Sequence, residues 1–119
     1  MKREDIINEK LDELSKSDFR SSFKLKDIDV KYIKDKGIDV IEEHARIFVK
    51  DRIAGNIIRN DGKQTPMKGH PVFVAQHACA CCCRGCLYKW HGMSMNRYLT
   101  KNEINYIVEL IMTWIERQL

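Results

Sequence analysis

The chain has 119 residues, of which 44% are hydrophobic and 32% are charged, with a formal net charge of +4. This length suits one domain around one core, and the composition is that of an ordinary globular protein. No apolar run approaches the roughly 18 residues of a membrane span, and the acidic, polar start is unlike a signal peptide. We therefore expect no membrane contact and a cytoplasmic location. The mild positive charge permits an acidic partner such as nucleic acid without requiring one.

The first third of the chain predicts helices separated by one extended stretch. Residues 3–15 place four aliphatic side chains on one helical face, with acidic residues early, where the positive end of the helix dipole favours them. Residues 17–25 are typical of an extended segment or loop. Residues 26–37 predict a short helix that Gly37 ends.

A further helix is predicted immediately after Gly37. Asp39 with Glu42 fits a capping box, and an apolar stripe continues from there to Ile53. His44 lies on this stripe, where a hydrogen-bonded core histidine is the simpler interpretation.

Residues 54–70, AGNIIRNDGKQTPMKGH, lack periodicity and predict a long polar loop. Loops of this length in a small domain are often functional. We expect this one to receive an anion or a phosphate, although it lacks the glycine pattern of a phosphate-binding loop. The candidate residues are Asn60, Lys63, Gln64, Thr65, Lys68 and His70.

Two helices are predicted in the rest of the chain. Pro71 suits a first helical turn, with His70 as its cap, and the helix would run to Gly92 with a bend at Gly85. Thr100 starts the last helix with a capping box, and the wide apolar face that follows predicts a well-buried element. The sequence thus predicts an all-α fold, a compact bundle of about five helices with one long polar loop.

All five cysteines lie between residues 79 and 86. In a reducing compartment such clustered thiols are metal ligands, reactive groups or buried small residues more often than disulfides. On one continuous helix Cys79, Cys83 and Cys86 would share an apolar face, which favours plain core packing. Their spacing also matches the iron–sulfur triad of radical enzymes, but 119 residues cannot supply the barrel those enzymes need.

Two functional interpretations compete with core packing. Cys83-x2-Cys86-x4-His91 provides the first three ligands of a zinc knuckle, but Asn96 stands where the fourth belongs. His77 or His70 would have to replace it, or water would complete an open site. Alternatively, Cys82 or Cys83 acts as a nucleophile with His77 or His91 as its base.

The chain also resembles a known family from about residue 19 onward. The likeness rests on FRSSFKL, YIKDKG with IEEHARIFV, NDGKQTPMKGHPVFVAQHA, CCRGCLYKWHG and LTKNEINYIVELIMTWIERQ. The family is catalogued as domain of unknown function 4186 and has no established activity. The resemblance implies that Cys82, Cys83, Cys86 and the four histidines belong to the family pattern, whereas Cys79 and Cys81 replace threonines. Residues 1–17 lie outside it, which predicts an N-terminal helical extension followed by a single domain at 18–119.

These observations favour a Cys/His site that binds a metal, with zinc as the predicted ion, because imidazole and thiolate donors suit it. The predicted ligands are His77, Cys82, Cys83, Cys86 and His91. Two alternatives stay open: a thiol-dependent or metal-assisted hydrolytic enzyme, and a non-catalytic module that binds nucleic acid or a protein. The apolar last helix, with Trp114 and Ile115, is compatible with a homodimer.

Overall fold

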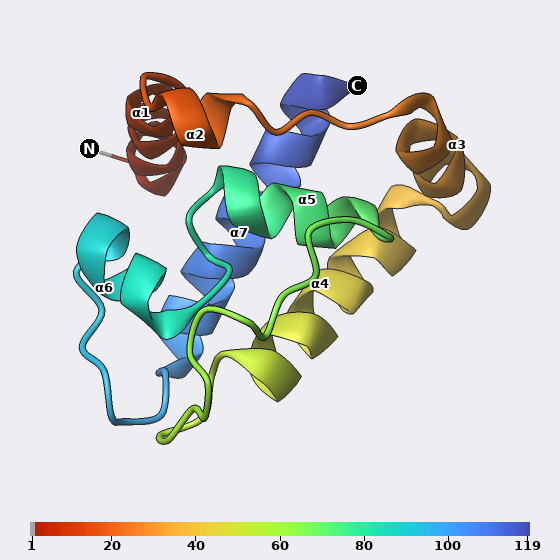
Figure 1. Ribbon diagram of the computed structural model, residues 1–119. Coiled ribbons are helices and arrows are strands. Elements are labelled where there is room, and N and C mark those ends of the chain that lie inside the picture. Colours follow the sequence, from red (N-terminus) through yellow and green to blue (C-terminus); the bar gives the residue numbers. More distant parts are fainter. Residues whose placement is uncertain (1) are drawn as a thin grey trace.

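A computed structural model describes residues 2–119 and confirms the all-α class (Figure 1). It contains seven helices within these residues rather than about five. The additional ones are a short helix in the segment expected to be extended, and a second helix where one long helix was expected. The elements are α1 (Arg3–Ser15), α2 (Asp18–Ser21), α3 (Asp27–Lys36), α4 (Ile38–Arg52), α5 (Pro71–Ala78), α6 (Arg84–His91) and α7 (Lys101–Gln118).

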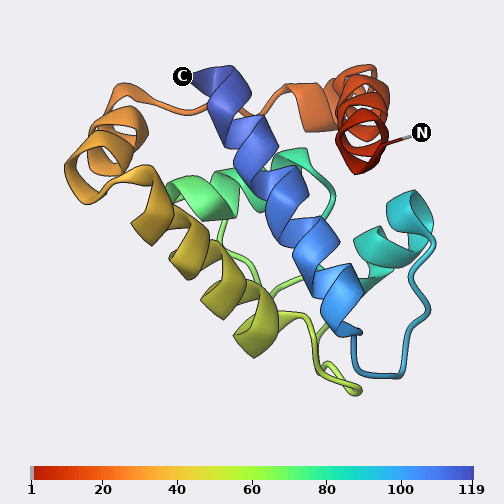
Figure 2. The ribbon, with the colours of Figure 1, turned by 180° about the vertical axis from the view of Figure 1, so that it is seen from behind.

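Helix α7 lies at the centre of the fold. It packs against α4, α5 and α1, and Figure 2 shows it running between α4 and α1. Ile107, Leu110, Ile111 and Ile115 are fully buried on it, so the apolar face predicted from the sequence is used within the chain. The predicted homodimer would therefore need another surface or the half-exposed Trp114.

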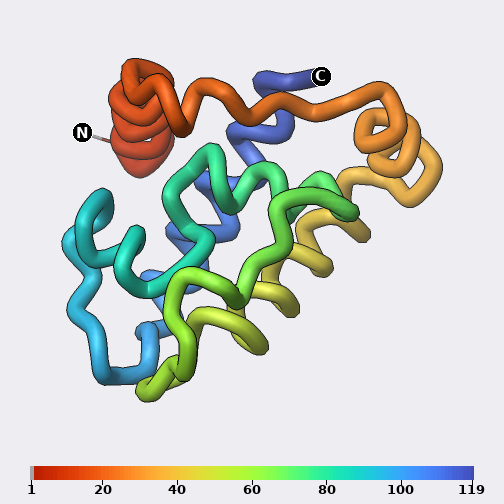
Figure 3. Tube along the Cα trace, viewed as in Figure 1, coloured from red at the N-terminus to blue at the C-terminus, as the bar shows by residue number. Residues whose placement is uncertain are grey.

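Helix α1 belongs to the same hydrophobic core. Its Ile7, Leu11 and Leu14 are buried, and it contacts α7 and α2. From α2 the chain crosses to α3 as an extended segment, which can be followed in the tube of Figure 3. Within the described residues, no helix has both the length and the apolar character that a bilayer span requires.

The helix starts were predicted with mixed success. At α7, Thr100 Oγ1 accepts from the Glu103 backbone N–H (3.1 Å), and the Glu103 carboxylate accepts from the Thr100 N–H (2.8 Å), so this capping box is confirmed. The box predicted at Asp39 is wrong. Gly37, with φ of 92°, both ends α3 and begins α4, because a glycine allows the chain to reverse within one residue.

The continuous helix expected from Pro71 to Gly92 is also wrong. Helix α5 ends at Ala78, and Ala80 adopts a left-handed conformation with φ of 56°. The Cys81 N–H bonds the Gln76 carbonyl (2.8 Å) and the Ala80 N–H bonds the His77 carbonyl (3.3 Å). These two bonds form a Schellman motif, which usually contains glycine where Ala80 stands. The chain therefore turns at residues 79–83 rather than bending at Gly85.

His70 caps α5, as the sequence suggested. Its Nδ1 accepts from the Val72 N–H (3.0 Å), which leaves the proton on Nε2, 3.0 Å from His44 Nδ1. Rings of Tyr32, Phe48 and Phe73 pack around His70. Burial, and then the neighbouring His44, lower the pKa of His70 from its ordinary 6.5 to about 4, with Asp29 opposing the shift.

The His70 cap makes stability depend on pH. The unfolded chain takes up this proton near pH 6.5, but the folded chain takes it up only near pH 4. The stability that neutral His70 provides is therefore complete above pH 6.5 and is lost as the pH falls towards 4. We expect a loss of up to about 3 kcal/mol in the free energy of unfolding. His70→Asn keeps a capping acceptor without this titration, so urea unfolding should show a flatter pH dependence; an unchanged slope would contradict the assignment.

Candidate metal centre

The segment between α5 and α6 divides the five cysteines into two groups. Cys79 and Cys81 are completely buried: the Cys79 thiol donates towards the Leu110 carbonyl (3.8 Å) and the Cys81 thiol towards the Cys79 carbonyl (3.4 Å). Burial raises the pKa of both thiols, so they stay protonated. Core packing therefore accounts for Cys79, as predicted, and for Cys81.

The other three cysteines bring their sulfur atoms together. Cys82 and Cys83 precede α6, and Cys86 lies in its first turn. The Sγ of Cys86 is 3.2 Å from that of Cys83 and 3.6 Å from that of Cys82, and all three atoms lie within 4.8 Å of one another. Among the residues described, they form the one group of at least three His, Cys, Asp or Glu donors close enough to share an ion. We call Cys82, Cys83 and Cys86 the thiol triad.

Arg20, on α2, places its guanidinium against the thiol triad. Nη2 donates to Cys86 Sγ (3.1 Å), and Nη1 donates to the His77 carbonyl (2.7 Å) and towards Cys82 Sγ (3.7 Å). The side chain is only 8% exposed. A buried cation needs a negative or strongly polar partner, and Arg20 finds the two sulfurs and the His77 carbonyl here.

The thiols of the triad differ in pKa. Hydrogen bonds from Cys82 and then Cys83, together with Arg20, lower the pKa of Cys86. Hydrogen bonds with Cys83 and then Cys86, together with burial, raise the pKa of Cys82. These contacts favour the thiolate form of Cys86 over that of Cys82. Binding a cation would displace the protons that remain on the triad, because thiolates are the ligands.

The structure does not bring the two predicted histidine ligands into the triad. His77 Nε2 lies 3.1 Å from both the Thr65 and Pro66 carbonyls, and its ring stacks on Phe23. His91 Nε2 lies 2.9 Å from the Cys79 carbonyl. The turn at residues 79–83 reverses the chain between the two histidines. Each ring then contacts backbone carbonyls instead of the triad.

His91 also lies near a second polar group, the Tyr106 hydroxyl, 3.3 Å from Nδ1. Burial lowers the pKa of His91 and raises that of Tyr106. The contact between His91 and Cys81, at 3.7 Å, involves a thiol outside the triad. No nucleophile–base pair of the predicted kind therefore exists between these two histidines and Cys82 or Cys83 among the described contacts.

Side chains of the polar loop support the triad by bonding backbone groups of residues 82–85. The buried Thr65 hydroxyl donates to the Cys82 carbonyl (2.8 Å). The Asp61 carboxylate accepts from the Arg84 and Gly85 N–H groups (2.9 and 2.8 Å) and so caps α6. Gln64 in turn donates to Asp61 (2.7 Å). These bonds give two of the predicted ligand-loop residues, Gln64 and Thr65, a supporting role.

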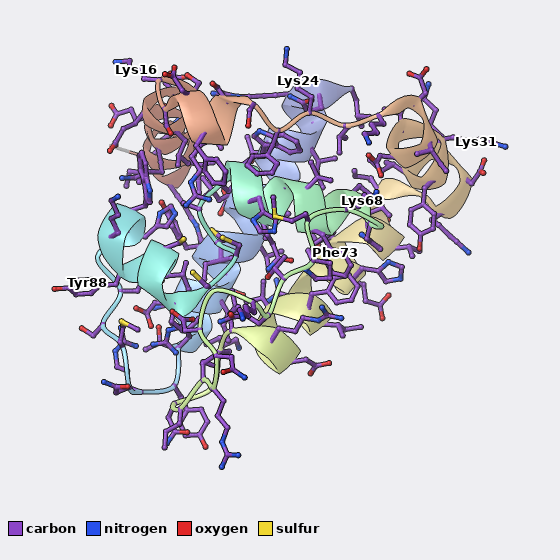
Figure 4. The ribbon with its side chains drawn as sticks, in the orientation of Figure 1. Lys16, Lys24, Lys31, Lys68, Phe73 and Tyr88 are labelled. Carbon is purple, nitrogen blue, oxygen red and sulfur yellow. The ribbon has the colours of Figure 1, made fainter. Side chains whose placement is uncertain are left out.

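The other predicted loop residues do not converge on one ligand position. Asn60, Lys63 and Lys68 are exposed, and His70 is occupied as the cap of α5. Lys68, labelled in Figure 4, borders an open hollow of about 330 Å³ together with Lys24 and other residues. The loop as an anion site stays a prediction.

Arg84 fixes the other side of α6. This side chain is 2% exposed and donates to the carbonyls of Gly55 (2.7 Å), Ser94 (2.6 Å) and Arg97 (2.8 Å). The start of the polar loop and the segment after α6 are therefore tied to the residue next to Cys83. Figure 4 shows Tyr88 projecting outward from α6, on the side away from the rest of the fold.

A comparison with known families supports the resemblance seen in the sequence. Residues 8–116 match the family described as domain of unknown function (DUF4186). The chain belongs to this family. The region that matches DUF4186 includes both the triad and Arg20, and it begins within α1. No solved structure matches the chain, so the geometry of the triad carries the functional argument.

Arg20 is the main site residue that sequence reasoning missed. It lies 62 residues before Cys82, and neither its position nor its spacing indicates a contact with sulfur. The stretch FRSSFKL, which carries part of the DUF4186 likeness, was the one signal that pointed to it.

Removing the Asp61 cap should loosen α6. We expect Asp61→Ala to lower the free energy of unfolding by about 1–2 kcal/mol, because two N–H groups at the start of α6 lose their acceptor. Asp61→Asn keeps one carbonyl acceptor and should lose less. Chemical denaturation measures both, with the exposed Asp51 on α4 changed to alanine as the control. An Asp61→Ala loss no larger than that of Asp51→Ala would contradict the capping role.

Proposed function

We propose that the protein binds one zinc ion through the thiolates of Cys82, Cys83 and Cys86. The observation that carries this proposal is the convergence of three sulfur atoms within 4.8 Å. Three free thiols in plain apolar packing need not meet at one point, and Cys79 and Cys81 illustrate this by pointing elsewhere.

The distances between the sulfurs fit tetrahedral coordination. Zinc–sulfur bonds of about 2.3 Å at tetrahedral angles place neighbouring sulfurs about 3.8 Å apart. The Cys83–Cys86 and Cys82–Cys86 separations, 3.2 and 3.6 Å, are shorter than this. Small side-chain rotations would open the triad to receive the metal.

Arg20 supports a thiolate centre through its charge. Three thiolates and Zn²⁺ carry a net charge of −1, which the guanidinium would balance. Its contact with Cys86 Sγ, at 3.1 Å, is the kind of outer hydrogen bond that orients a metal ligand. Soft thiolate donors favour zinc or copper(I) over magnesium and calcium, and zinc is the ion most often bound in this way.

Three protein donors leave a fourth coordination position for water or an external ligand. His77 and His91 are engaged by backbone carbonyls, and no further His, Asp or Glu joins the triad among the described residues. An ion with an open position can act as a Lewis acid, so the metal-assisted hydrolytic alternative stays compatible with this site.

Metal analysis of the untagged, purified protein tests the proposal. We expect close to one equivalent of zinc per chain. Replacing any one triad cysteine by serine should weaken zinc binding by more than about a hundredfold in competition with a chromogenic chelator. Cys79→Ala is the matched control and should bind normally. Less than about a tenth of an equivalent of any metal, with no uptake on reconstitution, would end the proposal.

Replacing Arg20 tests the charge balance. We expect Arg20→Met to lower zinc affinity by about 10- to 100-fold, because the thiolates lose their buried counter-charge. Arg117→Met is the matched control: Arg117 pairs with Asp12 and Asn8 on α1 and should have no effect on zinc binding. Equal zinc affinities in both variants would contradict this role for Arg20.

A further inference from the structure

Cys86 differs from the four other cysteines in its accessibility. Cys79, Cys81, Cys82 and Cys83 are buried, with at most 8% of each residue exposed, whereas Cys86 is partly exposed. It lies in the first turn of α6 and faces the Arg20 guanidinium. Of the triad, Cys86 is thus the residue most exposed to solvent.

Cys83 is the natural partner for Cys86 in a disulfide. The two form a Cys-x2-Cys pair at the start of α6, in which Cys83 is the cap and its Sγ accepts from the Cys86 N–H (3.4 Å). Their sulfurs are 3.2 Å apart, closer than the 3.6 Å between Cys82 and Cys86. A disulfide between the adjacent Cys82 and Cys83 would need a strained ring.

We propose that Cys86 reacts with low-molecular-weight disulfides such as glutathione disulfide, and that Cys83 resolves the product to form a Cys83–Cys86 disulfide. The thiol triad would then carry out thiol–disulfide exchange with the same sulfurs that form the proposed zinc site. Cys82 does not take part in the bond and keeps its thiol.

The reaction is two successive thiol–disulfide exchanges. The Cys86 thiolate attacks one sulfur of the small disulfide, forming a Cys86 mixed disulfide and releasing one thiolate of the reagent. Cys83 loses its proton to solvent and attacks Cys86 Sγ, which releases the second thiolate. Counting the proton that Cys86 gives up when it becomes a thiolate, the protein loses two electrons and two protons; the two released thiolates take up two protons and become two thiols.

The disulfide and the metal exclude one another. Oxidation removes two of the three thiolates that would hold zinc, so it releases the ion, and bound zinc in turn blocks attack by Cys86. The triad would therefore bind metal only under reducing conditions.

Intact mass measurement after incubation with glutathione disulfide tests the proposal. The full chain is used both as purified and after removal of metal by a chelator, with circular dichroism to confirm that it stays folded. We expect the metal-free protein to lose the mass of two hydrogens, and peptide mapping to join Cys83 to Cys86. Metal-loaded protein should react at least about tenfold more slowly, since its thiolates are coordinated.

Serine variants separate the roles of the three cysteines. Cys83→Ser should stop at the mixed disulfide and gain one glutathionyl group on Cys86. Cys82→Ser is the matched control and should still form the Cys83–Cys86 bond. Cys86→Ser should form neither product at a comparable rate. A Cys83→Ser protein that carries the glutathionyl group on another cysteine would overturn the assignment of Cys86.

The outcomes distinguish this proposal from the zinc site. Zinc content is measured before oxidation. A protein that holds zinc but forms no Cys83–Cys86 disulfide after metal removal overturns the redox proposal alone. A protein that takes up no metal yet forms this disulfide overturns the zinc proposal alone.

Discussion

The turn between α5 and α6 is the constraint on which the proposed site depends. Two backbone bonds close α5, and Ala80 accepts a left-handed conformation that costs an alanine about 1 kcal/mol. A continuous helix would have spread the sulfurs around its circumference. Because the chain turns first, Cys82 and Cys83 precede α6, and both sulfurs meet Cys86 in its first turn.

Segments far apart in the sequence hold this turn in place. Arg20 reaches it from α2, Thr65 bonds it from the polar loop, and Asp61 caps the helix that follows. At the start of α6, the Arg84 side chain donates hydrogen bonds to the carbonyls of Gly55 and Ser94. The triad is thus held from three sides by hydrogen bonds, the kind of support that keeps binding groups in position.

Local signals predicted much of the fold but not the geometry of the site. The capping box at Thr100 and the cap at His70 were confirmed because a cap depends on neighbouring residues. The end of α5 was missed because Ala80, unlike glycine, gives no signal for a left-handed turn. Three of the predicted ligands meet, whereas the placement of His77 depends on carbonyls of the distant polar loop. The spacing of residues in the sequence does not predict contacts between such distant segments.

Zinc-edge X-ray absorption of the purified protein tests the central claim most directly, because it reports the atoms around the ion. The account predicts three sulfur neighbours at about 2.3 Å and one lighter atom at about 2.0 Å. A first shell made mainly of imidazole nitrogens, or of fewer than three sulfurs, would contradict a centre built on Cys82, Cys83 and Cys86.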